Sequence, residues 1–174
     1  MIKLDQIAID FIHNSTITGG IFEYLMAVFA VSFNNEIVAF VYALGLFHLP
    51  YDIKNFVLCA LLPSGGLLVT YVLKRKISRI RPTLFVPRAQ ALIFDFRGRE
   101  KNHSMPSGDS TQAAIFWSLM AHFQVVSGWT AGVLALFTML ARVYYMCHYP
   151  TDTLLGAFVG FIVFNTIRCL VFSF

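Results

Sequence analysis

Long apolar stretches alternate with short polar clusters along most of this 174-residue chain. Six stretches come near the length of about 20 residues that a helix needs to cross the hydrocarbon core of a bilayer. They are residues 17–33, 37–49, 53–73, 110–126, 129–146 and 153–172. The last four predict membrane helices. The first two are short and are separated only by Asn34, Asn35 and Glu36, so they could form a tight hairpin or one long broken helix.

The N-terminal segment differs, because its apolar residues recur at helical spacing and its polar residues lie elsewhere. This pattern predicts an amphipathic helix lying in the membrane interface, and a frayed polar terminus is the alternative. The apolar positions are Leu4, Ile7, Ala8, Phe11 and Ile12, and the polar positions are Lys3, Asp5, Gln6 and Asp10.

Composition indicates that lipid surrounds most of the chain. Hydrophobic residues make up 57% of it, charged residues only 13%, and the mean hydropathy is +0.69, which is more apolar than an ordinary soluble domain. We therefore predict a single domain over residues 1–174: an all-α, multi-pass integral membrane bundle of about six transmembrane helices with an interfacial N-terminal helix. The net charge is +4, but basic residues are bunched between Lys74 and Lys101 without a nucleic-acid-binding motif, which argues against nucleic acid as a partner.

Small residues recur within two of the apolar stretches. Gly65 and Gly66 are adjacent, and Gly156 and Gly160 have the GxxxG spacing. Because such positions let two helix backbones approach closely in lipid, we expect helix contacts there.

Three polar clusters lie at the ends of apolar stretches: Lys74 with Arg81-Pro82, then Pro106-Ser107-Gly108-Asp109, then Arg142 with His148 and Asp152. If the third stretch ends at Lys74, the fourth begins on the same side of the membrane, and the fifth returns to that side at Arg142. All three clusters are therefore predicted to meet at one membrane face. Polar groups at membrane depth are costly and are by default functional.

The residue types in these clusters suit the binding of a phosphate group. Arg81 and Arg142 offer planar guanidinium forks, and Lys74 adds a point charge. The Ser107 hydroxyl and the Gly108 amide precede a helix, whose dipole also favours an anion. We predict that these five residues form the substrate phosphate-binding site, with no metal and no cofactor, because the sequence holds no carboxylate-rich metal motif.

His148 is the predicted nucleophile. It would attack phosphorus and form a phosphohistidine, while Asp152 would hold the other ring nitrogen and stabilise the charged imidazole. Water would then hydrolyse the intermediate.

The clusters resemble the three motifs of the type 2 phosphatidic acid phosphatase superfamily, which also includes vanadium haloperoxidases and bacterial acid phosphatases. Residues 74–82, KRKISRIRP, match the first motif, and the third keeps its spacing at Arg142, His148 and Asp152. The second keeps residues 106–108 but has Asp109 where the family has histidine. The resemblance runs from about residue 54 to the C-terminus and implies a metal-independent lipid phosphatase.

Asp109 is the departure from the family, whose histidine at this position is the general acid. Nearby cations favour an ionised carboxylate, which cannot donate a proton, whereas burial favours the protonated form. Asp109 could therefore be catalytic, or it could cap the following helix together with Gln112. His103 is an alternative proton donor. Without a general acid, a diphosphate should react better than a phosphate monoester, because its leaving group needs little protonation.

Seven further basic residues follow the first cluster or lie between the clusters. We expect a solvated or headgroup-binding loop, because juxtamembrane basic residues attract anionic lipid. They are Arg75, Lys76, Arg79, Arg88, Arg97, Arg99 and Lys101.

The sequence thus predicts a membrane-bound lipid phosphate or diphosphate phosphohydrolase, with a bias toward isoprenoid diphosphates as a further hypothesis. Its partners would be the lipid substrate and the bilayer. A lipid-phosphate-binding or scaffolding homologue without catalysis is the alternative, and a phosphotransferase would use the same site. The positive-inside rule favours a cytoplasmic site, whereas most of the family faces outward or into a lumen, so both orientations stay open.

Overall fold

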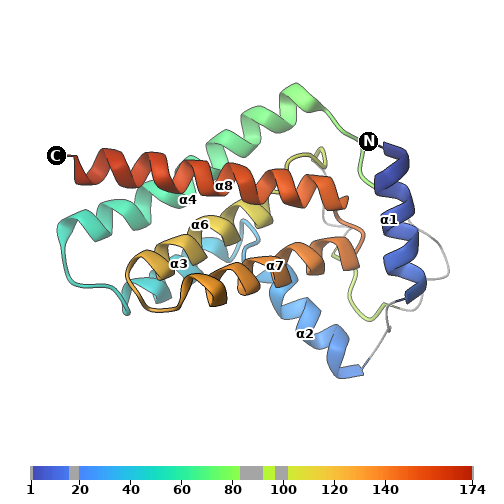
Figure 1. Ribbon diagram of the computed structural model, residues 1–174, viewed down its shortest axis with the longest axis horizontal. Helices are drawn as coiled ribbons and strands as arrows, with labels where there is room; N and C mark the ends of the chain where they lie inside the picture. The colour runs from blue at the N-terminus through green and yellow to red at the C-terminus, as the bar shows by residue number, and fades with distance from the viewer. Residues whose placement is uncertain (1, 16–19, 83–91, 97–101, 174) are drawn as a thin grey trace.

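The computed structural model of the chain describes residues 2–15, 20–82, 92–96 and 102–173 (Figure 1). Within these residues the chain forms seven helices and no strand, which confirms the predicted all-α architecture. The helices are α1 (Ile2–Ser15), α2 (Gly20–Val31), α3 (Val38–Leu46), α4 (Ile53–Ile77), α6 (Gly108–His122), α7 (Gly128–Tyr144) and α8 (Pro150–Phe172).

Six of these helices lie at the six apolar stretches, but their lengths differ. Helices α4 and α8, with 25 and 23 residues, are long and apolar enough to cross a membrane, whereas α2 and α7 are apolar but shorter. Helix α2 packs on α7, while α3 packs on α4 and α6. Because α2 and α3 have different neighbours, they do not form the tight hairpin that was one of the two alternatives.

Helix α6 lies at the centre of the bundle and contacts α4, α7 and α8 (Figure 1). Its residues 109–116 are all buried, so this helix is enclosed on every side and has no solvent or lipid face there. Two of its polar side chains donate hydrogen bonds to the backbones of neighbouring helices. The Thr111 hydroxyl donates to the Gly156 carbonyl at 2.9 Å, and the Gln112 amide donates to the Pro63 carbonyl at 2.9 Å.

Glycines allow the close approach of α8 to α6, as their spacing predicts. A Cβ atom on Gly156 would lie well inside contact distance of the Ser107 carbonyl oxygen, and one on Gly160 would meet the Thr111 carbonyl oxygen in the same way. Gly66 of α4 similarly faces Gln112 of α6, where a Cβ would lie 2.8 Å from the amide nitrogen. These contacts fix the start of α6 against α8 and α4.

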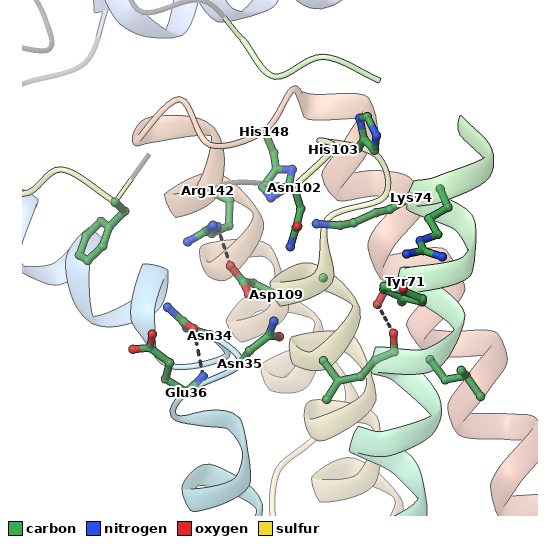
Figure 2. A pocket seen from close by; sticks show the side chains of 16 residues that line it. Asn34, Asn35, Glu36, Tyr71, Lys74, Asn102, His103, Asp109, Arg142 and His148 are labelled. Atoms are coloured by element: carbon green, nitrogen blue, oxygen red, sulfur yellow. Dashed lines mark hydrogen bonds and ion pairs between the residues drawn. The ribbon is translucent and has the colours of Figure 1, made fainter. Parts of the chain in front are cut away.

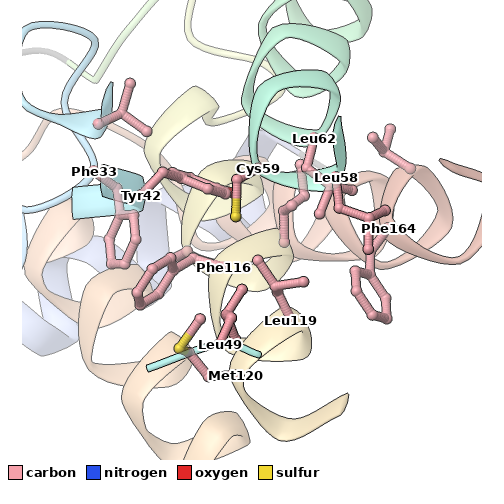
Figure 3. Close-up of a cluster of buried hydrophobic side chains, with 14 of the residues drawn as sticks. Phe33, Tyr42, Leu49, Leu58, Cys59, Leu62, Phe116, Leu119, Met120 and Phe164 are labelled. Carbon is pink, nitrogen blue, oxygen red and sulfur yellow. The ribbon is translucent and has the colours of Figure 1, made fainter. Parts of the chain in front are cut away.

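The main apolar core lies between α3, α4, α6 and α8, where residues such as Leu58, Leu62 and Leu119 are fully buried (Figure 3). The outer faces of the helices are also apolar. Trp129, for example, is 89% exposed and Leu68 is 64% exposed. An exterior with so many large exposed apolar side chains suits a lipid environment.

Helix α1 packs across the ends of α7 and α8. Its predicted interfacial face is open, since Leu4 and Phe11 are each 72% exposed. Ile9 is buried against Val143 and Met146. Asp5 is also buried, with 3% exposure, although the sequence pattern gave it only as one of the polar positions.

Candidate active site

The three polar clusters meet at one pocket of about 940 Å³. It is lined by Lys74 of α4, Gly108 and Asp109 of α6, Arg142 of α7 and His148 of the α7–α8 connection. Figure 2 shows Lys74, Arg142 and His148 around the same space, close to Asp109. The structure therefore brings these predicted site residues together.

Lys74 lies in the last turn of α4, and Arg81 follows shortly after the helix ends. Ser78 has a left-handed backbone (φ 48°, ψ 35°) and its N–H donates to the Lys74 carbonyl at 3.0 Å, which ends the helix. The chain then turns, and Arg81 becomes buried beside the pocket. Its Nε donates to the Asn102 carbonyl at 2.7 Å, and its Nη1 donates to the Cys147 carbonyl at 2.6 Å.

His148 is buried, and its partners define the tautomer of the ring. Nδ1 lies 2.7 Å from the Ser104 carbonyl oxygen, which can only accept, so Nδ1 carries the proton. Nε2 lies 3.2 Å from Nη1 of Arg81, which can only donate, so Nε2 carries the lone pair. The ring therefore points the nitrogen that carries its lone pair at the guanidinium of Arg81.

Asp152 does not bond directly to the ring, so the prediction that it holds the second ring nitrogen is wrong in this detail. Its Oδ2 lies 3.8 Å from His148 Nδ1 and accepts the Tyr149 N–H at 2.9 Å. The Ser104 carbonyl orients the ring instead. Asp152 is fully buried behind the imidazole, where its charge acts at short range.

The start of α6 is capped by Ser107, not by Asp109. The Ser107 Oγ accepts the Ser110 N–H at 3.3 Å, and its own N–H donates to the Asp152 carbonyl at 3.0 Å. The capping arrangement proposed for Asp109 with Gln112 is therefore wrong. Ser107 is fully buried behind the helix start, and it is Gly108 that lines the pocket.

Asp109 instead pairs with Arg142, the arginine of the third cluster. Its Oδ2 lies 2.8 Å from Nε of Arg142, and both side chains are buried (Figure 2). Nη1 of Arg142 donates to the Ala30 carbonyl of α2 at 3.1 Å. A nearby guanidinium favours the ionised form of a carboxylate. Asp109 is thus a counterion of Arg142.

Arg79 has a role that differs from the predicted solvated loop. Its Nη1 lies 2.7 Å from Oδ1 of Asp152 and its Nη2 lies 2.6 Å from Oδ2 of Asp5, and its side chain is only 10% exposed. Burial alone would lower the pKa of Arg79, but the hydrogen bonds and charges of the two carboxylates raise it above its ordinary value. Arg75 and Lys76 are exposed as expected. The other residues assigned to that loop, Arg88, Arg97, Arg99 and Lys101, lie outside the described residues.

His103, the alternative proton donor, lines the pocket and is exposed. Its carbonyl accepts from Nη2 of Arg81 at 3.4 Å, which holds this segment beside the pocket. Its position is compatible with a donor at the pocket mouth.

Two supporting residues escaped the sequence reasoning. Ser104 orients the imidazole through its backbone carbonyl, and no side-chain motif signals such a role. Glu23 is fully buried in α2, where its Oε1 accepts the N–H groups of Ile93 and Phe94 at 2.6 and 3.2 Å. An acidic residue inside an apolar stretch is costly, and that cost was a signal for Glu23 in the sequence.

Comparisons with known proteins agree with this geometry. The chain shares 31% identity over 112 residues with phosphatidylglycerophosphatase B of Bacillus subtilis strain 168, an alignment that covers 58% of this chain and 50% of the relative. The chain thus spans about half the length of the curated relative it matches.

The fold is also similar to a crystal structure described as the first transmembrane PAP2 type phosphatidylglycerolphosphate phosphatase from Bacillus subtilis. The TM-score is 0.70 at 22% identity, with 97% of this chain and 86% of the other covered. The family model of the PAP2 superfamily matches residues 53–174, which contain all three polar clusters. This chain therefore belongs to the PAP2 superfamily.

Proposed function

We propose that the protein is a lipid phosphate phosphohydrolase that works through a phosphohistidine on His148. The observation that carries the proposal is the orientation of the imidazole, with Nδ1 on the Ser104 carbonyl and Nε2 beside Arg81. A phosphatidylglycerophosphatase of the same superfamily supports a lipid phosphate as substrate.

The first step would transfer the phosphoryl group to His148. Phosphate oxygens bind Lys74, Arg142 and the Gly108 amide, and they compete with Nε2 for the guanidinium of Arg81. This releases the lone pair of Nε2, which attacks phosphorus as the bond to the leaving oxygen breaks. The ring becomes a cation and is stabilised by the carboxylate of Asp152 behind it.

In the second step a water molecule attacks the phosphohistidine. The phosphorus–nitrogen bond breaks, inorganic phosphate forms, and His148 returns to its neutral form. An alcohol in place of water would make the same site a phosphotransferase, so the acceptor alone separates the two activities.

The leaving group would depend on Asp109. Because this carboxylate pairs with Arg142, it supplies no proton to a departing alkoxide. With a prenyl diphosphate, the terminal phosphoryl group goes to His148 and the leaving group is the prenyl monophosphate, which departs with little need of a proton. We therefore include in the proposal a preference for isoprenoid diphosphates over phosphate monoesters, with His103 as the donor available for the latter.

We further propose that the site opens to lipid in a multi-pass membrane bundle. One wall of the pocket consists of α4, where Leu67, Leu68 and Tyr71 lie below Lys74. Leu68 and Tyr71 are largely exposed on the outside of the bundle. This wall joins an apolar surface to the cationic residues, as a lipid with a phosphate headgroup requires.

Phosphate release from protein purified in detergent tests the proposal. Phosphatidic acid, phosphatidylglycerophosphate and a polyprenyl diphosphate are offered separately, with His148→Ala as the inactive variant. Release that disappears in His148→Ala supports the enzyme. Binding of these lipids without release by the unmodified protein would identify the lipid-binding alternative, and formation of a phosphorylated alcohol in the presence of glycerol would identify the transferase.

A further inference from the structure

A second charged cluster lies behind the imidazole, on the side away from the pocket. Arg79 bridges two carboxylates, Asp152 at 2.7 Å through Nη1 and Asp5 at 2.6 Å through Nη2. Asp152 belongs to α8 and faces His148, whereas Asp5 belongs to α1. Neither Arg79 nor Asp5 lines the pocket.

Hydrogen bonds and an aromatic ring hold the side chains of this cluster in place. The Thr151 hydroxyl donates to Oδ2 of Asp5 at 2.6 Å, and the Thr151 N–H donates to Oδ1 of the same carboxylate at 3.3 Å. The guanidinium carbon of Arg79 lies 4.1 Å from the centre of the Tyr149 ring, which is a cation–π contact. All three charged side chains are at least 90% buried.

The charge of this cluster has a consequence for the nucleophile. One guanidinium paired with Asp152 alone would cancel the negative charge that faces the ring. With Asp5 present, one positive charge is shared by two negative charges, and a net charge of −1 remains behind the imidazole. That charge favours the imidazole when it becomes positive in the phosphohistidine.

We propose that Asp5 and Arg79 are positioning residues for the reaction: Arg79 holds Asp152 in place, and Asp5 keeps the cluster negative so that Asp152 can stabilise the charged ring. The inference rests on the proposed phosphohydrolase function and adds an active role for the N-terminal helix. Helix α1 thereby becomes part of the catalytic apparatus without touching the substrate.

A purely structural role for Asp5 predicts a different result. If Asp5 only anchored α1, its loss would reduce the amount of folded protein and would lower the activity equally at every pH. A change in the charge behind the ring instead moves the pH at which His148 loses its proton and becomes reactive. The pH profile of kcat/KM separates the two roles.

The charged and titratable groups around His148 come from several elements, and only two of them are altered in the test. Arg81 and Asp152 are nearest, Lys74, Arg142, Asp109 and His103 share the pocket, and Arg79 with Asp5 lies behind. Asp5→Asn changes the charge behind the ring from −1 to 0, and Arg79→Gln changes it to −2. The acidic limb of the pH profile of kcat/KM reports the pH at which His148 loses its proton. The two variants must therefore move this limb in opposite directions.

The experiment uses the full chain in detergent with a short-chain phosphatidic acid as the substrate. In Asp5→Asn we expect kcat to fall about 10-fold, KM to change less than about 2-fold, and the acidic limb to move about 0.5 pH units lower. In Arg79→Gln we expect the limb to move to higher pH. Asp10→Asn, the same change at an exposed position of α1, should leave the profile unmoved.

The outcomes discriminate clearly. Unmoved limbs in both variants, or shifts in the same direction, would overturn the inference while the unmodified protein still releases phosphate. An inactive unmodified protein would instead overturn the proposed function. If one variant does not remain monodisperse in gel filtration, the other variant alone tests the inference. Its acidic limb must then move in the direction given above, and an unmoved limb or a shift in the other direction overturns the inference.

Discussion

Asp109 offers the sharpest test of how this site differs from its family, because it replaces the expected acid with a counterion. Substitution by asparagine removes the charge and retains the shape. The gross Coulomb attraction between two unit charges 2.8 Å apart is about 6 kcal/mol at an effective dielectric constant of about 20. Much of this is offset by desolvation, yet removing one partner of a buried pair still costs about 3–5 kcal/mol.

In Asp109→Asn, Arg142 therefore lacks its counterion when no phosphate is present, and a bound phosphate would supply one. If about 1.4 kcal/mol of the cost is recovered in this way, inorganic phosphate binds about 10-fold more tightly. The assay is inhibition of turnover by inorganic phosphate, together with thermal unfolding in detergent. We expect a lower inhibition constant and a lower Tm.

Glu36→Gln is the matched control, because Glu36 also lines the pocket but is exposed on the turn before α3. It should change the inhibition constant much less. The reasoning is refuted if Asp109→Asn loses monoester turnover by about 10²- to 10⁴-fold with unchanged phosphate affinity, since that is the behaviour of a general acid.

Three further changes test other parts of the structure. Gly156→Ala should lower the free energy of unfolding by about 1–3 kcal/mol, because its methyl group meets the start of α6, whereas Gly132→Ala has open space and should not; thermal unfolding measures both. His103→Ala should reduce monoester turnover about 10-fold or more, with diphosphate turnover retained, and unchanged monoester turnover would remove His103 as the donor. Glu23→Ala leaves two backbone N–H groups without their acceptor, which should cost about 1–3 kcal/mol of stability, and an unchanged Tm would contradict the anchoring role.

The pattern of apolar residues predicted the long helices well because each begins at or just after a residue type that favours the start of a helix. Helix α8 begins at Pro150, which suits the first turn of a helix, and α4 begins after Asp52, whose carboxylate accepts the Lys54 N–H. The pair α2 and α3 was left ambiguous for a physical reason. Whether they fold on each other depends on contacts with α4, α6 and α7, and no local pattern encodes those contacts.

The meeting of Lys74, Gly108, Arg142 and His148 at one pocket was predictable because the motif spacing, with alternating crossings, placed them on one face. The supporting contacts were not. Arg79 looked like one more basic loop residue, because its partners Asp5 and Asp152 lie 74 and 73 positions away in the chain. The backbone carbonyl of Ser104 carries no residue-type signal at all.

The two groups of paired carboxylates and guanidinium groups in this site would have opposite consequences for a phosphate. Behind the imidazole, the Asp5–Arg79–Asp152 cluster does not contact the pocket, so its charge is the same in the empty and the occupied site. In front, Asp109 pairs with Arg142 inside the pocket, and in the proposed mechanism a phosphate oxygen would take its place. In that mechanism Asp109 would compete with both the substrate and the product. Competition of this kind weakens the binding of inorganic phosphate, and an enzyme that must release phosphate after every turnover gains from it. In the proposed mechanism, an aspartate at this position is therefore compatible with turnover without donating a proton.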